Sequence, residues 1–331
     1  MTKRIAIVGA GSWGTSLAVV AARAGHEVSL WSRDDEIVKS INEQRINSRY
    51  LTSIAIPDRV SATNNLDDAL DNSSLVLLAA PSHAARHLLT EMTPELDDDA
   101  VVVSVSKGIE TETGKRISEI VKEVAGTRAF VCLSGPSFAK EVVAGSPTAI
   151  VAASKDPAAA RTVQNDLSFE NLRIYTNADV IGTELGGSVK NVMAIAAGMT
   201  TGLGFGSNSV AALITRGLAE ITRLARREGA HVETLMGLAG LGDLVLTCTG
   251  HLSRNRYVGE QLGKGIALDE IVSGMNEVAE GVKTTRAVKQ LADRAGLEMP
   301  ITNEVNAVLY EGKSVRAAVA ELMSRPLREE V

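Results

Sequence analysis

The chain has 331 residues, of which 45% are hydrophobic, 22% are charged and 3% are aromatic, and its formal net charge is −6. This length allows two ordinary domains, each able to bury a core built from aliphatic side chains and alanine. The negative charge disfavours nucleic acid as a partner, and no apolar run reaches the roughly 20 residues of a membrane span.

The first half of the chain alternates strand and helix patterns. Residues 5–8 form an apolar run, a helical pattern follows over 12–24, and a second strand is expected over 28–31. Further strand-like runs are 75–79, 101–105, 130–133 and 149–153, and helical stretches such as 114–124 separate most of them. This alternation predicts a mostly parallel α/β sheet covered on both faces, with right-handed crossovers that make it doubly wound.

The second half has a different pattern. From Glu184 onward we find no convincing strand, whereas apolar residues recur at helical spacing over 213–225 and 288–295. Each of these helix faces ends near a glycine, as helices commonly do. We therefore predict an α/β domain over residues 1–180 and an all-α domain over residues 181–331.

A glycine-rich turn joins the first expected strand to the first helix. Gly9, Gly11 and Gly14 have the spacing G-x-G-x-x-G, with Ser12 and Trp13 between the last two. The first glycine allows a tight turn, the second lets the backbone approach a pyrophosphate, and the third lets the helix pack on the sheet. The N–H groups and dipole of the following helix attract phosphate. The pattern predicts a Rossmann-like dinucleotide-binding domain; the alternative is an ordinary strand-to-helix turn.

The end of the second strand bears on the choice of dinucleotide. Sites that prefer NAD usually have Asp or Glu there, which accepts from the ribose hydroxyls. This chain has Ser32-Arg33, and its nearest acids, Asp34 and Asp35, come one or two positions later. A guanidinium at Arg33 can pair with a 2′-phosphate and stack on adenine. We expect NADPH to be preferred, with NADH also possible; the alternative for Arg33 is a solvated surface arginine.

Two polar segments follow later strands of the expected sheet. Lys107 comes after the strand over 101–105, at the carboxyl edge where open α/β sheets bind ligands. Gly135 and Ser137 lie in Ser134-Gly-Pro-Ser-Phe138, which follows the strand ending at Leu133 and is expected to open a helix. Its N–H groups and the Ser137 hydroxyl can bind an anion or a substrate hydroxyl. A simple helix cap at Ser137 is the alternative.

The helical half contains three further polar segments. Leu185-Gly-Gly-Ser-Val-Lys-Asn191 puts Lys190 in an apolar helix, where burial lowers the pKa of an amino group and makes proton exchange easier; the alternative is a lysine that reaches the surface. In a second segment, three glycines precede an aspartate: Gly237-Leu-Ala-Gly-Leu-Gly-Asp243. Ser253-Arg254-Asn255 offers a guanidinium and two neutral side chains to a phosphate.

The two cysteines, Cys132 and Cys248, belong to no metal-ligand spacing, and we expect buried free thiols and no metal site. The N-terminus begins its first strand almost at once, without the pattern of an export signal. We therefore expect a cytoplasmic protein.

Taken together, these segments resemble the bacterial-type NAD(P)-dependent glycerol-3-phosphate dehydrogenases over essentially the whole chain. The resemblance rests on eight segments in the family's order: Gly9-Ala-Gly-Ser-Trp-Gly14, Pro81-Ser-His83, Lys107-Gly108, Ser134-Gly-Pro-Ser-Phe-Ala-Lys-Glu141, Leu185-Gly-Gly-Ser-Val-Lys-Asn191, Gly240-Leu-Gly-Asp-Leu-Val-Leu-Thr-Cys-Thr249, Ser253-Arg-Asn255 and Val278-Ala-Glu-Gly281. Trp13 and Ser137 stand where members often have Tyr or Phe and Thr, which preserves the stacking surface and the hydroxyl.

The resemblance implies a reaction and a set of site residues. The reaction is the reversible reduction of dihydroxyacetone phosphate to sn-glycerol 3-phosphate, which feeds phospholipid synthesis, with Lys190 as proton donor and acceptor. The residues that match cofactor contacts are Ser12, Trp13, Arg33, Lys107, Ala139, Arg254, Val278 and Glu280. The residues that match substrate contacts are Lys107, Gly135, Ser137, Lys190, Asp243, Ser253, Arg254 and Asn255. The helical domain would bind substrate, carry catalysis and contribute to a homodimer.

Two other functions remain open from the sequence. A two-domain β-hydroxyacid-type dehydrogenase shares a similar lysine helix but acts on a carboxylate, and Ser253-Arg254-Asn255 favours a phosphate ester instead. A nucleotide-sensing regulator would bind the dinucleotide without turnover and would not need Lys190.

Overall fold

The computed structural model describes residues 2–275, 279–327 and 329. The chain forms two compact units. The first unit comprises Met1–Lys107 and Lys115–Glu184, and the second comprises Gly108–Gly114 and Leu185–Val331.

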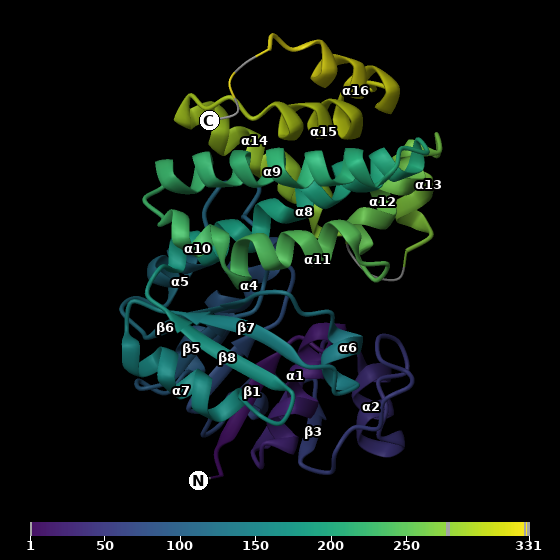
Figure 1. Ribbon diagram of the computed structural model, residues 1–331. Helices are drawn as coiled ribbons and strands as arrows, with labels where there is room; N and C mark the ends of the chain where they lie inside the picture. Colours follow the sequence, from purple (N-terminus) through teal and green to yellow (C-terminus); the bar gives the residue numbers. More distant parts are fainter. Residues whose placement is uncertain (1, 276–278, 328, 330–331) are drawn as a thin grey trace. The chain divides into compact units, whose positions relative to one another are not determined.

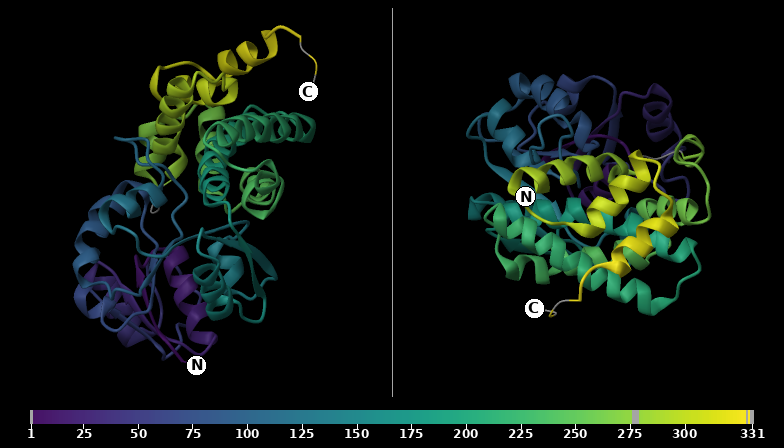
Figure 2. Two further views of the ribbon diagram at one scale, coloured as in Figure 1. Left: turned by 90° about the vertical axis from the view of Figure 1, so that its left-hand side faces the viewer. Right: turned by 90° about the horizontal axis from the view of Figure 1, so that it is seen from above.

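The first unit contains an eight-stranded sheet with helices on both faces (Figures 1 and 2). Its strands are β1 (Arg4–Val8), β2 (Glu27–Trp31), β3 (Val60–Thr63), β4 (Leu75–Leu78), β5 (Val101–Ser104), β6 (Phe130–Ser134), β7 (Thr148–Ala153) and β8 (Leu172–Asn177). Their order is β3-β2-β1-β4-β5-β6-β7-β8. All neighbours are parallel except β6 and β7. The predicted doubly wound, mostly parallel sheet is therefore confirmed.

The helices of this unit divide between the two faces because successive residues of a strand point to opposite sides. Ile5 and Ile7 of β1 pack into one apolar core, and Ala6 and Val8 pack into the other. The first core includes residues of α1 (Ser12–Arg23), α2 (Asp35–Gln44), α6 (Ala139–Val143) and α7 (Pro157–Leu167). The second includes residues of α3 (Leu66–Leu70), α4 (Ser82–Met92) and α5 (Ile117–Val124), while the short η1 (Thr93–Glu95) follows α4.

Three details differ from the sequence prediction. The strands β3 and β8 were not predicted: β3 is only four residues long, and β8 alternates buried and exposed residues without a long apolar run. The helix expected over 114–124 begins at Ile117, since Gly114 has a φ of 73° and lies outside the helical region. Ser137 is no helix cap, because α6 begins at Ala139 and the Ser137 hydroxyl donates to the carbonyl of Gly135.

The second unit is helical in the part of the chain that the structure describes, as predicted. Its helices are α8 (Val180–Gly202, which begins in the first unit), α9 (Ser207–Arg227), α10 (Val232–Met236), the π-helix η2 (Leu238–Gly242), α11 (Asp243–Thr249), α12 (Arg254–Gly263), α13 (Leu268–Ser273), α14 (Glu280–Ala295), α15 (Pro300–Tyr310) and α16 (Val315–Ser324). Among the described residues, no helix is both long enough and apolar enough to span a membrane.

Glycines let α8 approach α12 backbone to backbone within the second unit. A Cβ added at Gly198 would overlap the carbonyl oxygen of Arg256, and one at Gly259 would overlap that of Ile195. Gly186, one turn before Lys190, lies against η2 in the same way, with its added Cβ only 2.5 Å from the Ala239 carbonyl oxygen. These contacts bring the first turn of α12 and the start of α11 to the middle of α8.

Candidate active site

The three glycines of the N-terminal turn have different surroundings. Gly9 has a φ of 122°, and an added Cβ would lie 2.6 Å from the Ala79 carbonyl oxygen. A Cβ at Gly14 would overlap the Gly9 carbonyl oxygen, so these two glycines are required by the turn itself. A Cβ at Gly11 would meet nothing within 4 Å. Gly11, directly before α1, therefore exposes its backbone to a ligand at the N-terminus of a twelve-residue helix.

A matched pair of substitutions separates these roles. In Gly11→Ala we expect an unchanged melting temperature and a dinucleotide Kd raised about tenfold, because the added methyl group occupies the space that the pyrophosphate would enter. In Gly14→Ala we expect a loss of about 1–3 kcal/mol of folding free energy from overpacking. Thermal unfolding and titration with NADPH measure the two effects. Equal behaviour of the variants would contradict this assignment.

The structure shows the surroundings of three residues predicted to contact the cofactor. Trp13 lies partly buried against the core, and its indole Nε1 is buried without a hydrogen-bond partner in the described part of the chain. Buried donors normally have an acceptor, so this N–H is an exception among the described side chains. Ser12 donates to the carbonyl of Tyr50 at 3.2 Å. Arg33 is exposed at the end of β2.

Lys107, Gly135 and Ser137 lie together at the carboxyl edge of the sheet. The Lys107 amino group donates to the Gly135 carbonyl at 2.8 Å, and the Ser137 hydroxyl donates to the same oxygen at 2.9 Å. Gly135 has a φ of 136°, and its added Cβ would lie 3.0 Å from the Cα of Ile150, so a larger residue would be strained. The carbonyl of Ala139, the first residue of α6, accepts from Ser16 of α1. This cluster is thereby tied to the helix that follows the glycine turn.

Lys190 is buried in the second unit, and only 5% of its surface is exposed. Its amino group donates to Asp243 Oδ1 at 2.7 Å and to Thr247 Oγ1 at 2.6 Å. Asp243 and Thr247 are one turn apart on α11, so both side chains face α8. The carboxylate compensates the buried ammonium charge, which would otherwise be costly. The sequence analysis did not select Thr247, although its i, i+4 spacing from Asp243 would have indicated it.

Asn255 joins three helices beside this centre. Its Nδ2 donates to Asn191 Oδ1 at 3.0 Å, and its Oδ1 accepts from the Gly281 N–H at 2.9 Å. Ser253 is the N-cap of α12 and accepts from the Arg256 N–H. Asn255 thus holds the first turn of α12 against α8 and the start of α14. Asn191 was not among the predicted site residues.

The remaining predicted residues are placed as follows. Arg254 is exposed in the first turn of α12, and Glu280 is half-buried at the start of α14. Val278 lies outside the described residues.

The cysteines are both buried and free, as predicted. Burial is the main reason why the pKa of the Cys248 thiol is raised to about 12; Lys190 opposes this rise, and Asp243 adds to it. Burial likewise raises the pKa of Cys132 well above its usual value. Both thiols therefore stay protonated at neutral pH and are poor nucleophiles. Among the described residues, no cluster of His, Cys, Asp or Glu is suited to a metal ion.

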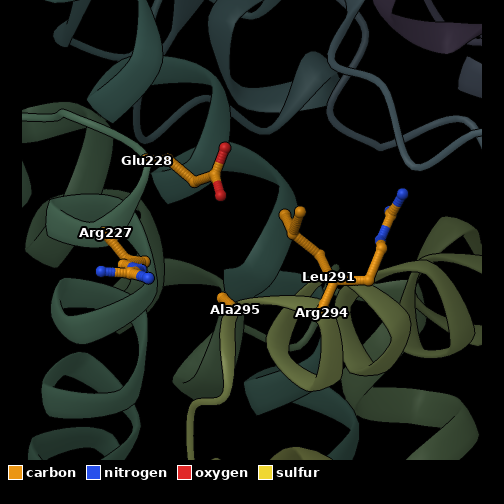
Figure 3. A pocket seen from close by; sticks show the side chains of 5 residues that line it. All are labelled: Arg227, Glu228, Leu291, Arg294 and Ala295. Carbon is orange, nitrogen blue, oxygen red and sulfur yellow. The ribbon is translucent and has the colours of Figure 1, made fainter.

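A cavity of about 320 Å³ in the second unit lies away from these residues; it is lined by Arg227, Glu228, Leu291, Arg294 and Ala295 (Figure 3). Figure 3 shows the two guanidinium groups on opposite sides of it. The lining comes from the last turns of α9 and α14 and the residue that follows α9, where helix carbonyls attract cations rather than anions. No predicted site residue lines this cavity.

Comparisons with known proteins identify related chains. Residues 4–160 match the family model of the NAD-dependent glycerol-3-phosphate dehydrogenase N-terminus, and residues 179–320 match that of the C-terminus. The chain is 55% identical to a protein named glycerol-3-phosphate dehydrogenase [NAD(P)+] from Koribacter versatilis, with 99% of both chains covered. It is 51% identical to one of the same name from Citrifermentans bemidjiense, covering 100% of this chain and 99% of that one.

A solved structure is similar as well. The crystal structure of glycerol-3-phosphate dehydrogenase from Coxiella burnetii is 41% identical and superimposes with a TM-score of 0.95, covering 98% of this chain and 99% of that one.

Proposed function

Since the chain belongs to the family of NAD-dependent glycerol-3-phosphate dehydrogenases, we propose that it catalyses the reversible NAD(P)H-dependent reduction of dihydroxyacetone phosphate to sn-glycerol 3-phosphate. The observation that carries the proposal is the buried amino group of Lys190, held by Asp243 and Thr247. We assign dinucleotide binding to residues 1–180, and substrate binding and catalysis to residues 181–331.

Lys190 is the proton donor and acceptor of this reaction. When bound, a reduced dinucleotide would supply the hydride for the ketone carbon, which leaves negative charge on the ketone oxygen. The Lys190 ammonium stabilises that oxygen and gives it a proton, and the neutral amine takes the proton back in the reverse direction. Asp243 and Thr247 fix the amino group in one position.

Several segments of the chain would hold the cofactor. Gly9, Gly11 and Gly14 shape the turn around the pyrophosphate, and the other contacts are Ser12, Trp13, Arg33, Lys107, Ala139, Arg254, Val278 and Glu280. The open space beside Gly11 supports this set. NADPH is preferred over NADH because Arg33, rather than an acid, follows β2.

The proposed substrate contacts suit a phosphate ester. They are Lys107, Gly135, Ser137, Lys190, Asp243, Ser253, Arg254 and Asn255. Arg254 binds the phosphate bidentately, and this binding energy positions the ketone. Ser253 and Asn255 support Arg254 through the packing of α12 on α8.

The cellular setting follows from the same proposal. The product supplies glycerophospholipid synthesis, and the enzyme acts in the cytoplasm, where two buried free thiols persist. It forms a homodimer, which is supported by exposed apolar side chains on the helical unit, including Phe205, Met236 and Tyr257. Light scattering of the purified protein measures its mass directly.

The test uses purified protein with NADPH and dihydroxyacetone phosphate. We expect the absorbance of the reduced nicotinamide to fall and sn-glycerol 3-phosphate to appear in equal amount. A 2-keto acid in place of the phosphate ester serves as the control and should give no oxidation. If neither NADPH nor NADH is oxidised with dihydroxyacetone phosphate, the proposed reaction is wrong.

A further inference from the structure

A single buried amide fastens the loop after α2 to the glycine turn. Asn47 has no exposed surface, and its Nδ2 donates to the Ala10 carbonyl and to Thr15 Oγ1, each at 2.9 Å. Its Oδ1 accepts from the N–H groups of Arg49 and Tyr50. The amide thereby makes four hydrogen bonds, so this loop has a fixed position beside the dinucleotide turn.

From that loop, Arg49 reaches the end of β2. Its Nη1 donates to Asp34 Oδ2 at 3.0 Å, and its guanidinium carbon lies 5.6 Å from the centre of the Tyr50 ring. Asp34 directly follows Arg33, which is exposed and makes no hydrogen bond or ion pair within the described residues. Two guanidinium groups from different segments therefore stand at the strand end where the adenosine ribose binds in this fold.

The acids at this strand end are already engaged. Asp34 Oδ1 accepts from two backbone N–H groups as the N-cap of α2, and Oδ2 accepts from Arg49. Asp35 Oδ1 accepts from the side-chain amide of Asn64 at 2.6 Å. An acid held in this way is a poor acceptor for ribose hydroxyls. The ion pair with Arg49 also reduces the repulsion between Asp34 and a nearby phosphate.

We propose that Arg49 is a second specificity-determining residue for NADPH, which binds the 2′-phosphate alongside Arg33 and neutralises Asp34. The proposal rests on the proposed function, in which the glycine turn binds a nicotinamide dinucleotide. A 2′-phosphate carries nearly two negative charges, and planar guanidinium groups match its oxygens. Arg33 alone would leave the charge of Asp34 beside it. An ion pair that only fastens the loop would instead affect NADPH and NADH equally.

The test measures binding rather than turnover. NADPH and NADH are each titrated into the protein, and the tryptophan fluorescence gives both Kd values. In Arg49→Ala we expect the Kd for NADPH to rise about tenfold or more, as when one charge-assisted hydrogen bond is lost, and the Kd for NADH to change less than about twofold. Arg33→Ala should give the same pattern. Arg59→Ala is the matched control, because Arg59 pairs with Glu27 at the opposite end of β2. This variant should leave the ratio of the Kd for NADPH to the Kd for NADH unchanged.

A second variant separates the two parts of the role. Asn and Asp are about equally good N-cap residues, so Asp34→Asn should keep α2 intact while removing the charge. Added to Arg49→Ala, it should recover part of the lost NADPH affinity. If Arg49→Ala weakens the binding of NADPH and NADH equally, or weakens the binding of neither, the proposed role of Arg49 is wrong. The turnover assay tests the proposed reaction separately. If the protein binds both cofactors without turnover, the proposed reaction is wrong, but the ratio of the Kd for NADPH to the Kd for NADH still tests the role of Arg49.

Discussion

Replacing Lys190 with methionine should lower kcat by about a thousandfold or more, because proton transfer and stabilisation of the oxyanion are lost together. The Kd for NADPH should stay within about twofold, since Lys190 is not among the proposed cofactor contacts. Single-turnover kinetics with dihydroxyacetone phosphate and a fluorescence titration with NADPH measure the two quantities. A variant that keeps wild-type kcat would remove Lys190 from the chemistry.

Stability complicates this variant and needs its own control. Lys190→Met leaves Asp243 buried without its partner, at 1% exposure, and we expect a loss of about 3–5 kcal/mol. Adding Asp243→Asn removes the uncompensated charge, so Lys190→Met with Asp243→Asn should regain much of the melting temperature and stay inactive. Recovery of activity along with stability would mean that Lys190 acts only as part of the core.

The fold of the first unit was largely predictable because its strands are marked by apolar runs. Six of its eight strands begin and end within two residues of those runs, since buried strands in such a sheet need apolar residues on both faces. The edge strands β3 and β8 lack that mark, with exposed residues alternating in each. The strand β7 was predicted from its apolar run, but its antiparallel direction was not, because strand direction depends on the route of the connection and not on strand composition.

The candidate site was predictable as residue types but not as contacts. Lys190 and Asp243 could be selected because a charged residue in an apolar or glycine-rich segment is unusual, yet 53 positions separate them. Their pairing depends on how closely α8 and α11 pack, which periodicity does not specify. Asn47 escaped selection for a related reason. It looks like an ordinary polar loop residue, and only the fold brings its amide to Ala10 and Thr15.

The close approach of α8 and α12 leads to the second large effect. An added Cβ at Gly259 would overlap the Ile195 carbonyl oxygen and lie 2.9 Å from the Met199 N–H nitrogen, all of them backbone atoms that cannot rotate away. In Gly259→Ala, α12 must therefore shift from α8, and Arg254 and Asn255 at its first turn shift with it. The hydrogen bond from Asn255 to Asn191 should break.

We expect Gly259→Ala to lose about 1–3 kcal/mol of folding free energy from overpacking. The value of kcat/KM should fall about a hundredfold, because misplacing a binding group by about 1 Å can cost that much. Gly206→Ala is the matched control, since its added Cβ meets nothing within 4 Å and its φ of −85° suits any residue. Activity should be measured well below the melting temperature of the variant. If the variant is destabilised but keeps wild-type kcat/KM, the position of α12 matters only for folding. The proposed role of Arg254 in binding the phosphate would then be wrong.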